Sequence, residues 1–194
     1  MPSAAHGLYR RLGKVLISSD RIRAKVDELA GKISRDFSGE EVILVANLKG
    51  SFRFLSDLCS LIRIPVRIDF VSFNSYGAKD RPSGRIEVRK DLSLDVKDRN
   101  VVLVEDIVDT GLTLDAVIDY LNRFKKPRMI KICALLDKIS RRAVRVEIDY
   151  RGFVIPDGFV VGYGLDYDEY FRELNSVTVF HPPKNGRKTK KPGG

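Results

Sequence analysis

The chain has 194 residues, of which 43% are hydrophobic and 31% are charged, a composition typical of one folded domain rather than of a disordered chain. It contains no apolar run close to the roughly 20 residues that cross a bilayer, and its N-terminus lacks the apolar core of a secretory signal. Its two cysteines are too few for a disulfide framework, and its two histidines form no cluster for zinc. We therefore expect a cytoplasmic protein that does not associate with membranes.

The formal net charge is +9, which by itself fits either a nucleic-acid-binding protein or an enzyme whose substrate carries phosphates. The charge is uneven, because residues 184–194 hold five basic residues and no acid, which leaves +4 for residues 1–183. We expect residues 1–183 to form a single domain and residues 184–194 to be a basic, disordered tail. Such a tail is a solvated end rather than a nucleic-acid-binding arm, so nucleic acid is not an expected partner.

Three helices are predicted from apolar residues that recur every three or four positions. The first begins near Ser18–Asp20, where a side chain can cap it, and ends before Gly39. The second follows Phe52 and is broken by Pro65, and the third begins at Thr113. Each of these helices lies between apolar runs that predict strands.

The run Val101–Val104 is typical of a central parallel strand, because it is continuously apolar. Strands are expected at Val42–Leu48, Val66–Phe73, Ile86–Leu94, Val101–Val104, Met129–Leu136 and Phe159–Tyr163, with further short strands in Arg145–Pro156 and Val177–Phe180. Strands that alternate with helices favour right-handed crossovers. The predicted class is therefore α/β, with a mainly parallel central sheet flanked by helices.

Two acidic residues, Glu105 and Asp106, directly follow the apolar run Val101–Val104. In an open α/β sheet, ligands collect at the carboxyl ends of the strands. Adjacent carboxylates at that edge can bind vicinal hydroxyls or a magnesium ion. The position of these two acids therefore predicts a binding site rather than a simple connection.

A turn of the sequence Asp109-Thr110-Gly111 comes next, followed by Thr113 and the third predicted helix. Gly111 lets the backbone approach a phosphate closely, and the amides at the start of the helix favour an anion. Thr110 and Thr113 add hydroxyl donors. Taken singly, each residue also fits an ordinary turn and helix cap, but their order after an apolar strand indicates a sugar-phosphate site.

Residues 101–113 resemble the phosphoribosyl-pyrophosphate signature of type I phosphoribosyltransferases, and more narrowly that of the hypoxanthine-guanine phosphoribosyltransferases. The resemblance extends from about Val42 to Val179. Further motifs that carry it are Leu48-Lys49-Gly50-Ser51, Ser75-Tyr76, Leu135-Leu136-Asp137-Lys138 and Phe159–Tyr167 followed by Tyr170-Phe171-Arg172. Asp137 before Lys138 looks more bacterial than vertebrate within this family.

The resemblance implies the type I phosphoribosyltransferase fold for residues 1–183, with a small additional hood of strands beside the central sheet. It implies an enzyme of purine salvage that transfers the 5-phosphoribosyl group of phosphoribosyl pyrophosphate to a 6-oxopurine, hypoxanthine or guanine and possibly xanthine. The products are the nucleoside monophosphate and pyrophosphate. Mg²⁺ is the implied cofactor, and a homo-oligomer, dimer or tetramer, is the implied assembly.

The family pattern also assigns roles to residues. Those implied for phosphoribosyl pyrophosphate are Lys49, Gly50, Glu105, Asp106, Asp109, Thr110, Gly111, Thr113 and Arg172. Those implied for the purine are Lys138, Phe159, Val160 and Asp166, and those for the metal are Glu105, Asp106 and Asp166. Asp109 is the implied catalytic base, Ser75 and Tyr76 begin the implied mobile loop, and the Leu48-Lys49 peptide is often cis in the family.

Other interpretations stay open at this point. Asp109 alone could be a helix cap, Lys138 a charge at a strand end and Phe159 a core aromatic residue. A phosphoribosyltransferase fold that serves as a nucleic-acid-binding regulator would suit the basic charge, although it would not need Asp109, Lys138 and Ser75-Tyr76 together. An adenine- or orotate-specific transferase is a further alternative, against which the Lys138 motif argues, because a lysine donor favours a 6-oxo group.

Overall fold

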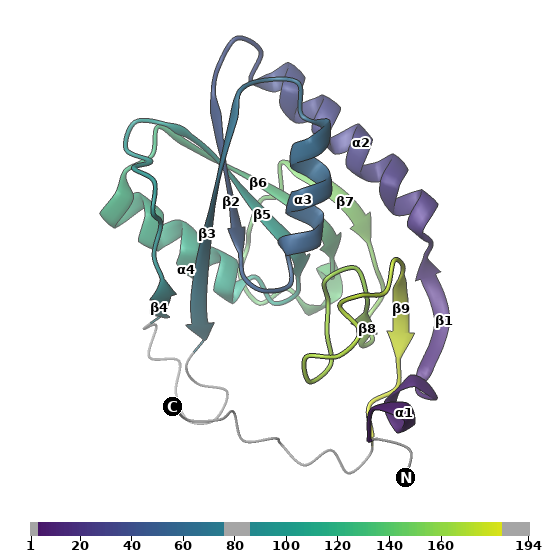
Figure 1. Ribbon diagram of the computed structural model, residues 1–194. Helices are drawn as coiled ribbons and strands as arrows, with labels where there is room; N and C mark the ends of the chain where they lie inside the picture. Colours follow the sequence, from purple (N-terminus) through teal and green to yellow (C-terminus); the bar gives the residue numbers. More distant parts are fainter. Residues whose placement is uncertain (1–3, 76–85, 184–194) are drawn as a thin grey trace.

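The computed structural model describes residues 4–75 and 86–183 of the chain (Figure 1). Its helices are α1 (Ala4–Tyr9), α2 (Ser19–Asp36), α3 (Phe52–Leu61), α4 (Leu112–Tyr120) and two short turns, η1 (Leu121–Lys125) and η2 (Ile139–Arg141). Its strands are β1 (Leu12–Ile17), β2 (Val42–Asn47), β3 (Val66–Ser75), β4 (Ile86–Lys90), β5 (Asn100–Val108), β6 (Met129–Asp137), β7 (Tyr150–Val154), β8 (Val160–Val161) and β9 (Val177–Phe180). No helix within the described ranges is long and apolar enough to cross a membrane.

The main sheet has six strands in the order β4-β3-β2-β5-β6-β7. All neighbouring pairs are parallel except β3 with β4 at one edge, which is antiparallel. The predicted α/β class with a mainly parallel central sheet is thus confirmed. Because the strands are parallel, their carboxyl ends meet at one edge, where the loops of β2, β5 and β6 come together.

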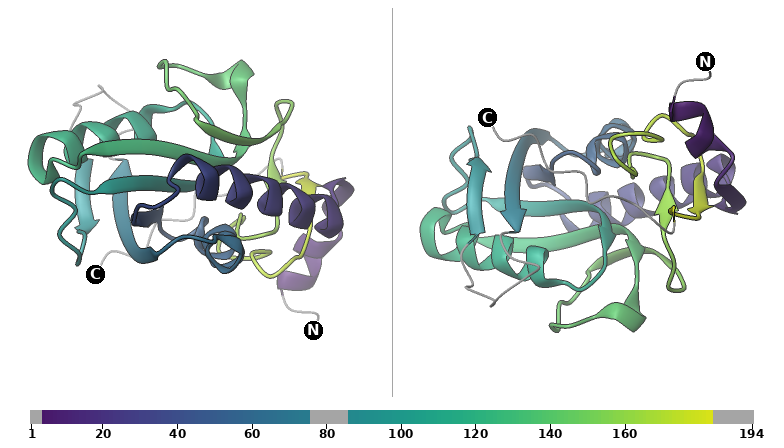
Figure 2. Two further views of the ribbon diagram at one scale, coloured as in Figure 1. Left: turned by 90° about the horizontal axis from the view of Figure 1, so that it is seen from above. Right: turned by 90° about the horizontal axis from the view of Figure 1, so that it is seen from below.

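Side chains of the central strands alternate between two apolar cores. Val42, Leu44 and Ala46 of β2 join α2 and α3 on one face, whereas Ile43 and Val45 join α4 on the other. Figures 1 and 2 show these helices covering opposite faces of the sheet. Burial on both faces explains why the strands are continuous apolar runs in the sequence.

A second, three-stranded sheet has the antiparallel order β1-β9-β8 and lies beside the carboxyl ends of the main strands (Figure 1). It confirms the small hood of strands. Its own apolar cluster is built on Val161, Phe171 and Phe180, with Leu8 and Leu12 packed against it. The N-terminal segment therefore completes a sheet whose other strands come from the last part of the chain.

Several predicted boundaries were wrong. β5 continues to Val108, because its far end pairs with β6 as far as Asp137, so Glu105 and Asp106 lie within the strand rather than after it. β4 ends at Lys90 instead of Leu94, and β8 is two residues long rather than five. The predicted loop after Ser75 and the predicted tail after residue 183 lie outside the described residues.

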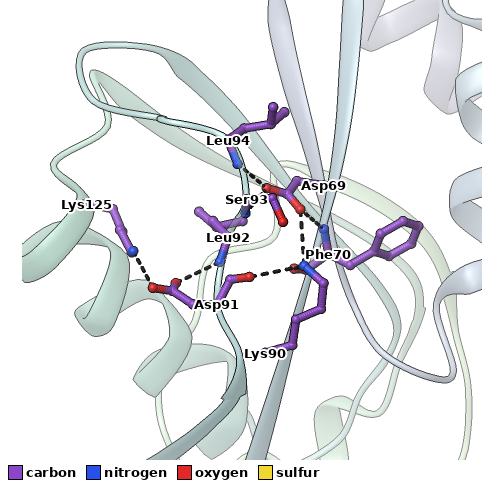
Figure 3. Close-up of polar contacts among 8 residues, drawn as sticks. All are labelled: Asp69, Phe70, Lys90, Asp91, Leu92, Ser93, Leu94 and Lys125. Carbon is purple, nitrogen blue, oxygen red and sulfur yellow. Dashed lines mark hydrogen bonds and ion pairs between the residues drawn. The ribbon is translucent and has the colours of Figure 1, made fainter.

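The buried carboxylate of Asp69 on β3 binds the end of β4 and the residues that follow it (Figure 3). Asp69 is 5% exposed, and its Oδ2 accepts hydrogen bonds from the amides of Ser93 and Leu94 at 2.6 and 2.7 Å. Its Oδ1 accepts from the amide of Phe70 at 2.7 Å and from Lys90 Nζ at 3.4 Å. Burial raises the pKa of Asp69, but the amide donors and Lys90 outweigh it and hold the pKa below its usual value.

We expect Asp69→Asn to lower the free energy of unfolding by about 2 kcal/mol at pH 7, because it removes hydrogen bonds to a buried charged group. A carboxyl whose pKa is lowered by folding stabilises above its unfolded pKa of about 4, and this contribution is lost as the pH falls through the folded pKa. The difference between the two proteins in urea unfolding should therefore shrink below pH 4.

The matched control is Asp95→Asn, an exposed aspartate in the same loop whose Oδ1 accepts from the amide of Lys97 at 2.9 Å. We expect a loss of about 0.5 kcal/mol or less for this variant. Equal losses for the two variants, or a difference that persists unchanged at pH 3, would show that the Asp69 carboxylate does not hold β4.

Candidate active site at the carboxyl edge of the parallel sheet

A cavity of about 190 Å³ lies where β5 passes into α4. Its lining residues are Asn47, Glu105, Asp106, Ile107, Val108, Asp109, Thr110, Gly111, Thr113 and Leu114. Six of them are predicted site residues of the signature, so the fold brings that segment around one space. A larger cavity of about 410 Å³ between α2, α3 and the hood contains none of the predicted residues.

The turn before α4 is shaped for an anion. Gly111 is the N-cap of α4 with φ +84°, and as a glycine it provides no side-chain acceptor for the first amides of the helix. The carbonyl oxygen of Thr110 accepts from the amides of Ala143 and Val144 at 2.9 and 3.3 Å, which anchors the turn from outside. The amide of Leu112 donates to Thr110 Oγ1 at 3.4 Å, and the next amides of the first turn are those suited to an external anion.

Two acidic side chains, the buried Glu105 and the half-buried Asp106, line the cavity. Burial raises the pKa of Glu105 well above its usual value, the charge of Asp106 adds to the rise, and a hydrogen bond with Asn47 opposes it. Burial likewise raises the pKa of Asp106 to about 6, although backbone amides and Arg172 oppose the shift. Two carboxyls held close together, whose pKa values stay raised although Arg172 opposes the shift at Asp106, are the environment expected of a cation or hydroxyl site.

Asn47 at the end of β2 was not among the predicted site residues. Its Oδ1 is buried and has no hydrogen-bond partner among the residues that the structure describes, and it lines the same cavity as Glu105 and Asp106. A buried acceptor without a partner costs free energy, so a ligand that donates or coordinates there would relieve it. The rule that ligands collect at the carboxyl ends of strands could have identified it, since Asn47 ends a buried strand.

Asp109 lines the cavity beside the turn that precedes α4. Its Oδ1 lies 3.2 Å from Arg141 Nε, an ion pair without hydrogen-bond alignment, and this oxygen is buried without a hydrogen-bond partner among the described residues. The side chain as a whole is 37% exposed. The exposed part of the side chain therefore consists of its other atoms, which include Oδ2.

On the hood side, Arg172 organises a charged network. Its guanidinium donates to the carbonyl of Gly164 at 2.7 Å and pairs with Asp166 at 2.9 Å and with Glu169 at 3.2 Å. Glu169 also pairs with the exposed Lys49 at 3.2 Å. Lys49, Asp166 and Arg172, which are distant in sequence, are thus brought together. The Leu48-Lys49 peptide is cis.

Gly50 connects this network to the carboxylates. A Cβ on Gly50 would overlap with the side chain of Asp106, and a Cβ on Gly164 would overlap with the carbonyl oxygen of Gly50. Gly164 also has φ +99°, which favours glycine. The loop after β2, the end of β5 and the hood therefore meet closely. They can do so only because Gly50 and Gly164 lack side chains.

The predicted purine residues lie apart from the small cavity. Lys138 follows β6, is 5% exposed and donates from Nζ to the carbonyl of Gly158 at 2.6 Å. Phe159 is 42% exposed, an unusual position for a core residue, and its ring meets Tyr167 edge-on at 5.7 Å. Val160 opens β8 and pairs with Val179. An exposed aromatic face next to a buried lysine fits a planar heterocycle better than it fits apolar packing.

The predicted mobile loop starts at the end of β3. Ser75 ends β3, where its backbone pairs with Ile86, and Tyr76 lies outside the described residues. Among the described residues, no three His, Cys, Asp or Glu side chains converge closely enough to hold a metal ion by themselves. The predicted metal residues Glu105, Asp106 and Asp166 therefore do not form a complete cage of their own.

Comparison with known proteins agrees with this geometry. A family model described as the phosphoribosyl transferase domain matches residues 18–168. The parallel sheet with its hood, the anion-binding turn at β5 and this match define the class of protein, the phosphoribosyltransferases.

Individual relatives narrow the class. The chain is 44% identical over 165 residues to a hypoxanthine-guanine phosphoribosyltransferase of Aquifex aeolicus, with 84% of this chain and 92% of that protein covered. A crystal structure of a hypoxanthine-guanine phosphoribosyltransferase from Bacillus anthracis has a TM-score of 0.84 and 44% identity, covering 88% of this chain and 99% of that one. The chain belongs to the hypoxanthine-guanine phosphoribosyltransferase family.

Some relatives are longer. The bifunctional protein TilS/HprT of Listeria innocua is 38% identical over 175 residues, and the match covers 90% of this chain but 27% of that protein. The chain thus spans about a quarter of the length of these bifunctional relatives.

We expect Gly164→Ala to destabilise the protein by about 2 kcal/mol or more, because backbone strain adds to overlap with the carbonyl of Gly50. Gly39→Ala is the matched control, since Gly39 also has a positive φ of +81° but nothing lies within 4 Å of a Cβ built there. It should lose only the backbone term of about 1 kcal/mol. Urea unfolding of both variants measures the difference. Equal losses would show that the backbone at Gly50 can move away from the added Cβ without lowering the free energy of unfolding.

Proposed function

We propose that this chain is an enzyme of purine salvage that transfers the 5-phosphoribosyl group of phosphoribosyl pyrophosphate to hypoxanthine or guanine. The observation that carries the proposal is the joint placement around one cavity of the anion-binding turn Asp109–Thr113, the buried Glu105 and the half-buried Asp106. The amide of Lys138 donates to the carbonyl of Val108, which lines this cavity, and its Nζ donates to the carbonyl of Gly158, the residue before Phe159. The family of the chain supports the same activity. The relatives described above are named for this transferase and give no support to a nucleic-acid-binding regulator.

The sugar-phosphate substrate would occupy the edge of the sheet. In this proposal the 5-phosphate accepts hydrogen bonds from amides and hydroxyls of Thr110, Gly111 and Thr113, which lie at the start of α4. The ribose hydroxyls donate to Glu105 and Asp106. The pyrophosphate lies toward the cationic Lys49 and Arg172, whose network extends to the hood.

Mg²⁺ fits the same acids as a partner shared with the substrate. Mg²⁺ is commonly held by one or two carboxylates together with substrate phosphates, so an incomplete protein cage is the expected arrangement. Glu105, Asp106 and Asp166 would hold the ion together with the substrate, and the buried Oδ1 of Asn47 would be a further oxygen within the same cavity. When bound, the ion offsets charge on the departing pyrophosphate.

The purine would stack on the exposed ring of Phe159, with the backbone of Val160 and the carboxylate of Asp166 beside it. The buried ammonium of Lys138 has only donors, so it favours an oxygen at the 6-position and leaves a 6-amino group facing another donor.

Asp109 is the proposed general base, which accepts the proton from nitrogen 7 as that nitrogen attacks the anomeric carbon. Its accessible Oδ2 beside the phosphate turn suits this task.

The remaining parts of the proposal rest on the family pattern alone. They are a loop beginning at Ser75 and Tyr76 that covers the reacting atoms, one transferase domain over residues 1–183 followed by a basic tail, a homo-oligomeric assembly and a cytoplasmic location.

Purified protein supplied with phosphoribosyl pyrophosphate and Mg²⁺ should convert hypoxanthine and guanine, and should not convert adenine at a comparable rate, because a buried donor left unpaired costs a large factor in specificity. Release of pyrophosphate with each of adenine, hypoxanthine, guanine and xanthine measures this. Turnover of none of the four bases would contradict the proposed function, and turnover of adenine alone would contradict the role of Lys138.

Asp109→Asn should lower kcat by about 100-fold or more at unchanged KM values, since an amide keeps the shape of the side chain but accepts no proton. Asp115→Asn is the matched control, because Asp115 lies one turn into α4, is exposed and does not line the cavity. Steady-state kinetics of both variants with hypoxanthine test the assignment. Near-normal turnover of Asp109→Asn would rule out Asp109 as the base.

A further inference from the structure

The segment from Lys138 to Val144 lies against the end of β5 and the turn that leads into α4. The amide of Lys138 donates to the carbonyl of Val108 at 2.9 Å, and the amide of Ala143 donates to the carbonyl of Thr110 at 2.9 Å. These backbone bonds fix the segment against the end of β5. A side chain in its middle can therefore be held in a defined place relative to Asp109.

Arg141 occupies that middle position and lies between two acids. Its Nε is 3.2 Å from Asp109 Oδ1, and its Nη1 is 3.8 Å from Asp157 Oδ1. Asp157 in turn accepts from the amide of Gly158 at 2.8 Å, and the carbonyl of Gly158 accepts from Lys138. The guanidinium is thus the link between the turn that holds Asp109 and the loop that leads to the purine side of the site.

This pairing contributes little to the stability of the fold. The side chains of Arg141, Asp109 and Asp157 are 49%, 37% and 65% exposed, and exposed ion pairs stabilise proteins by about 1 kcal/mol or less. The neighbouring Arg142 is different, because it pairs with Asp137, whose side chain is 1% exposed. Of the two adjacent arginines, Arg142 therefore stabilises the fold, whereas the contacts of Arg141 affect only the side chains beside it.

We propose that Arg141 is a positioning residue that holds the carboxylate of Asp109 by Oδ1 and so turns Oδ2 toward the purine. This inference rests on the proposed function, in which Asp109 is the base. An aspartate beside a turn can rotate about two side-chain bonds, and a base acts only within hydrogen-bond reach of the proton that it takes. A counter-ion on one oxygen restricts that rotation, and small misplacements of reacting groups cost large factors in rate.

The first test is Arg141→Gln, assayed by steady-state kinetics with hypoxanthine and phosphoribosyl pyrophosphate. We expect kcat to fall by about tenfold while both KM values change by less than about twofold, because only the orientation of the base is lost. Arg141→Lys should recover part of the loss, since it restores the charge without the planar fork. Arg145→Gln, which removes an exposed arginine four residues further along, should leave kcat unchanged.

The second test is a double-mutant cycle with Asp109→Asn. If Arg141 acts through Asp109, then Arg141→Gln should change kcat by less than about twofold in the Asp109→Asn background, where the base is already absent. A tenfold loss in both backgrounds would overturn the inference. Urea unfolding of Arg141→Gln should match that of the unaltered protein, and a large loss of stability would make the effect structural.

These outcomes separate the inference from the proposed function. Near-normal turnover of Asp109→Asn alone would remove the base and the inference together. If Asp109→Asn loses its turnover and Arg141→Gln keeps a normal kcat, only the positioning role of Arg141 is overturned. A raised KM for phosphoribosyl pyrophosphate at unchanged kcat would identify Arg141 as a substrate contact and would also overturn it.

Discussion

The close approach of Gly50 to Asp106 and to Gly164 is the constraint on which the site depends. The three residues come from the loop after β2, from β5 and from the hood, and each contact leaves no room for a Cβ. Because protein interiors are closely packed, a Cβ at Gly164 would push the hood away from the loop after β2, and a Cβ at Gly50 would displace the carboxyl group of Asp106. The carboxylates of the main sheet and the cations of the hood can face one substrate only while this contact holds.

Charge is arranged around that contact in two different ways. Desolvation raises the pKa values of the buried Glu105 and the half-buried Asp106, which prepares a place for a cation or for donors. Asp137, by contrast, is buried and already compensated by Arg142 and by Arg151, whose Nε lies 2.9 Å from its Oδ2. Breaking a compensated buried pair typically costs about 3–5 kcal/mol. The residue before Lys138 is thus fixed by structure, and the acids of the cavity are left for the ligand.

Much of the fold could be predicted because parallel strands buried on both faces leave plain apolar runs, and because helices have caps such as Ser18 before α2. The wrong predictions concern the ends of strands, which depend on contacts with other residues. The length of β5 depends on its pairing with β6, and β8 ends where Gly162 and Tyr163 adopt positive φ. The pairing of β5 with β6 cannot be recognised from the local sequence, since strand ends depend on pairing over long distances.

By itself the sequence determined the class of fold, the signature turn at Asp109–Thr113 and the family, because these depend on local spacing and on residue chemistry. Only the tertiary structure decided which residues share a cavity, that Asn47 belongs to it and that Arg141 contacts Asp109. Arg141 is 32 positions beyond Asp109 in a segment without a motif of its own. Its contact follows from the pairing of β5 with β6, which no local pattern records, because side-chain proximity across a sheet is set by register rather than by sequence separation.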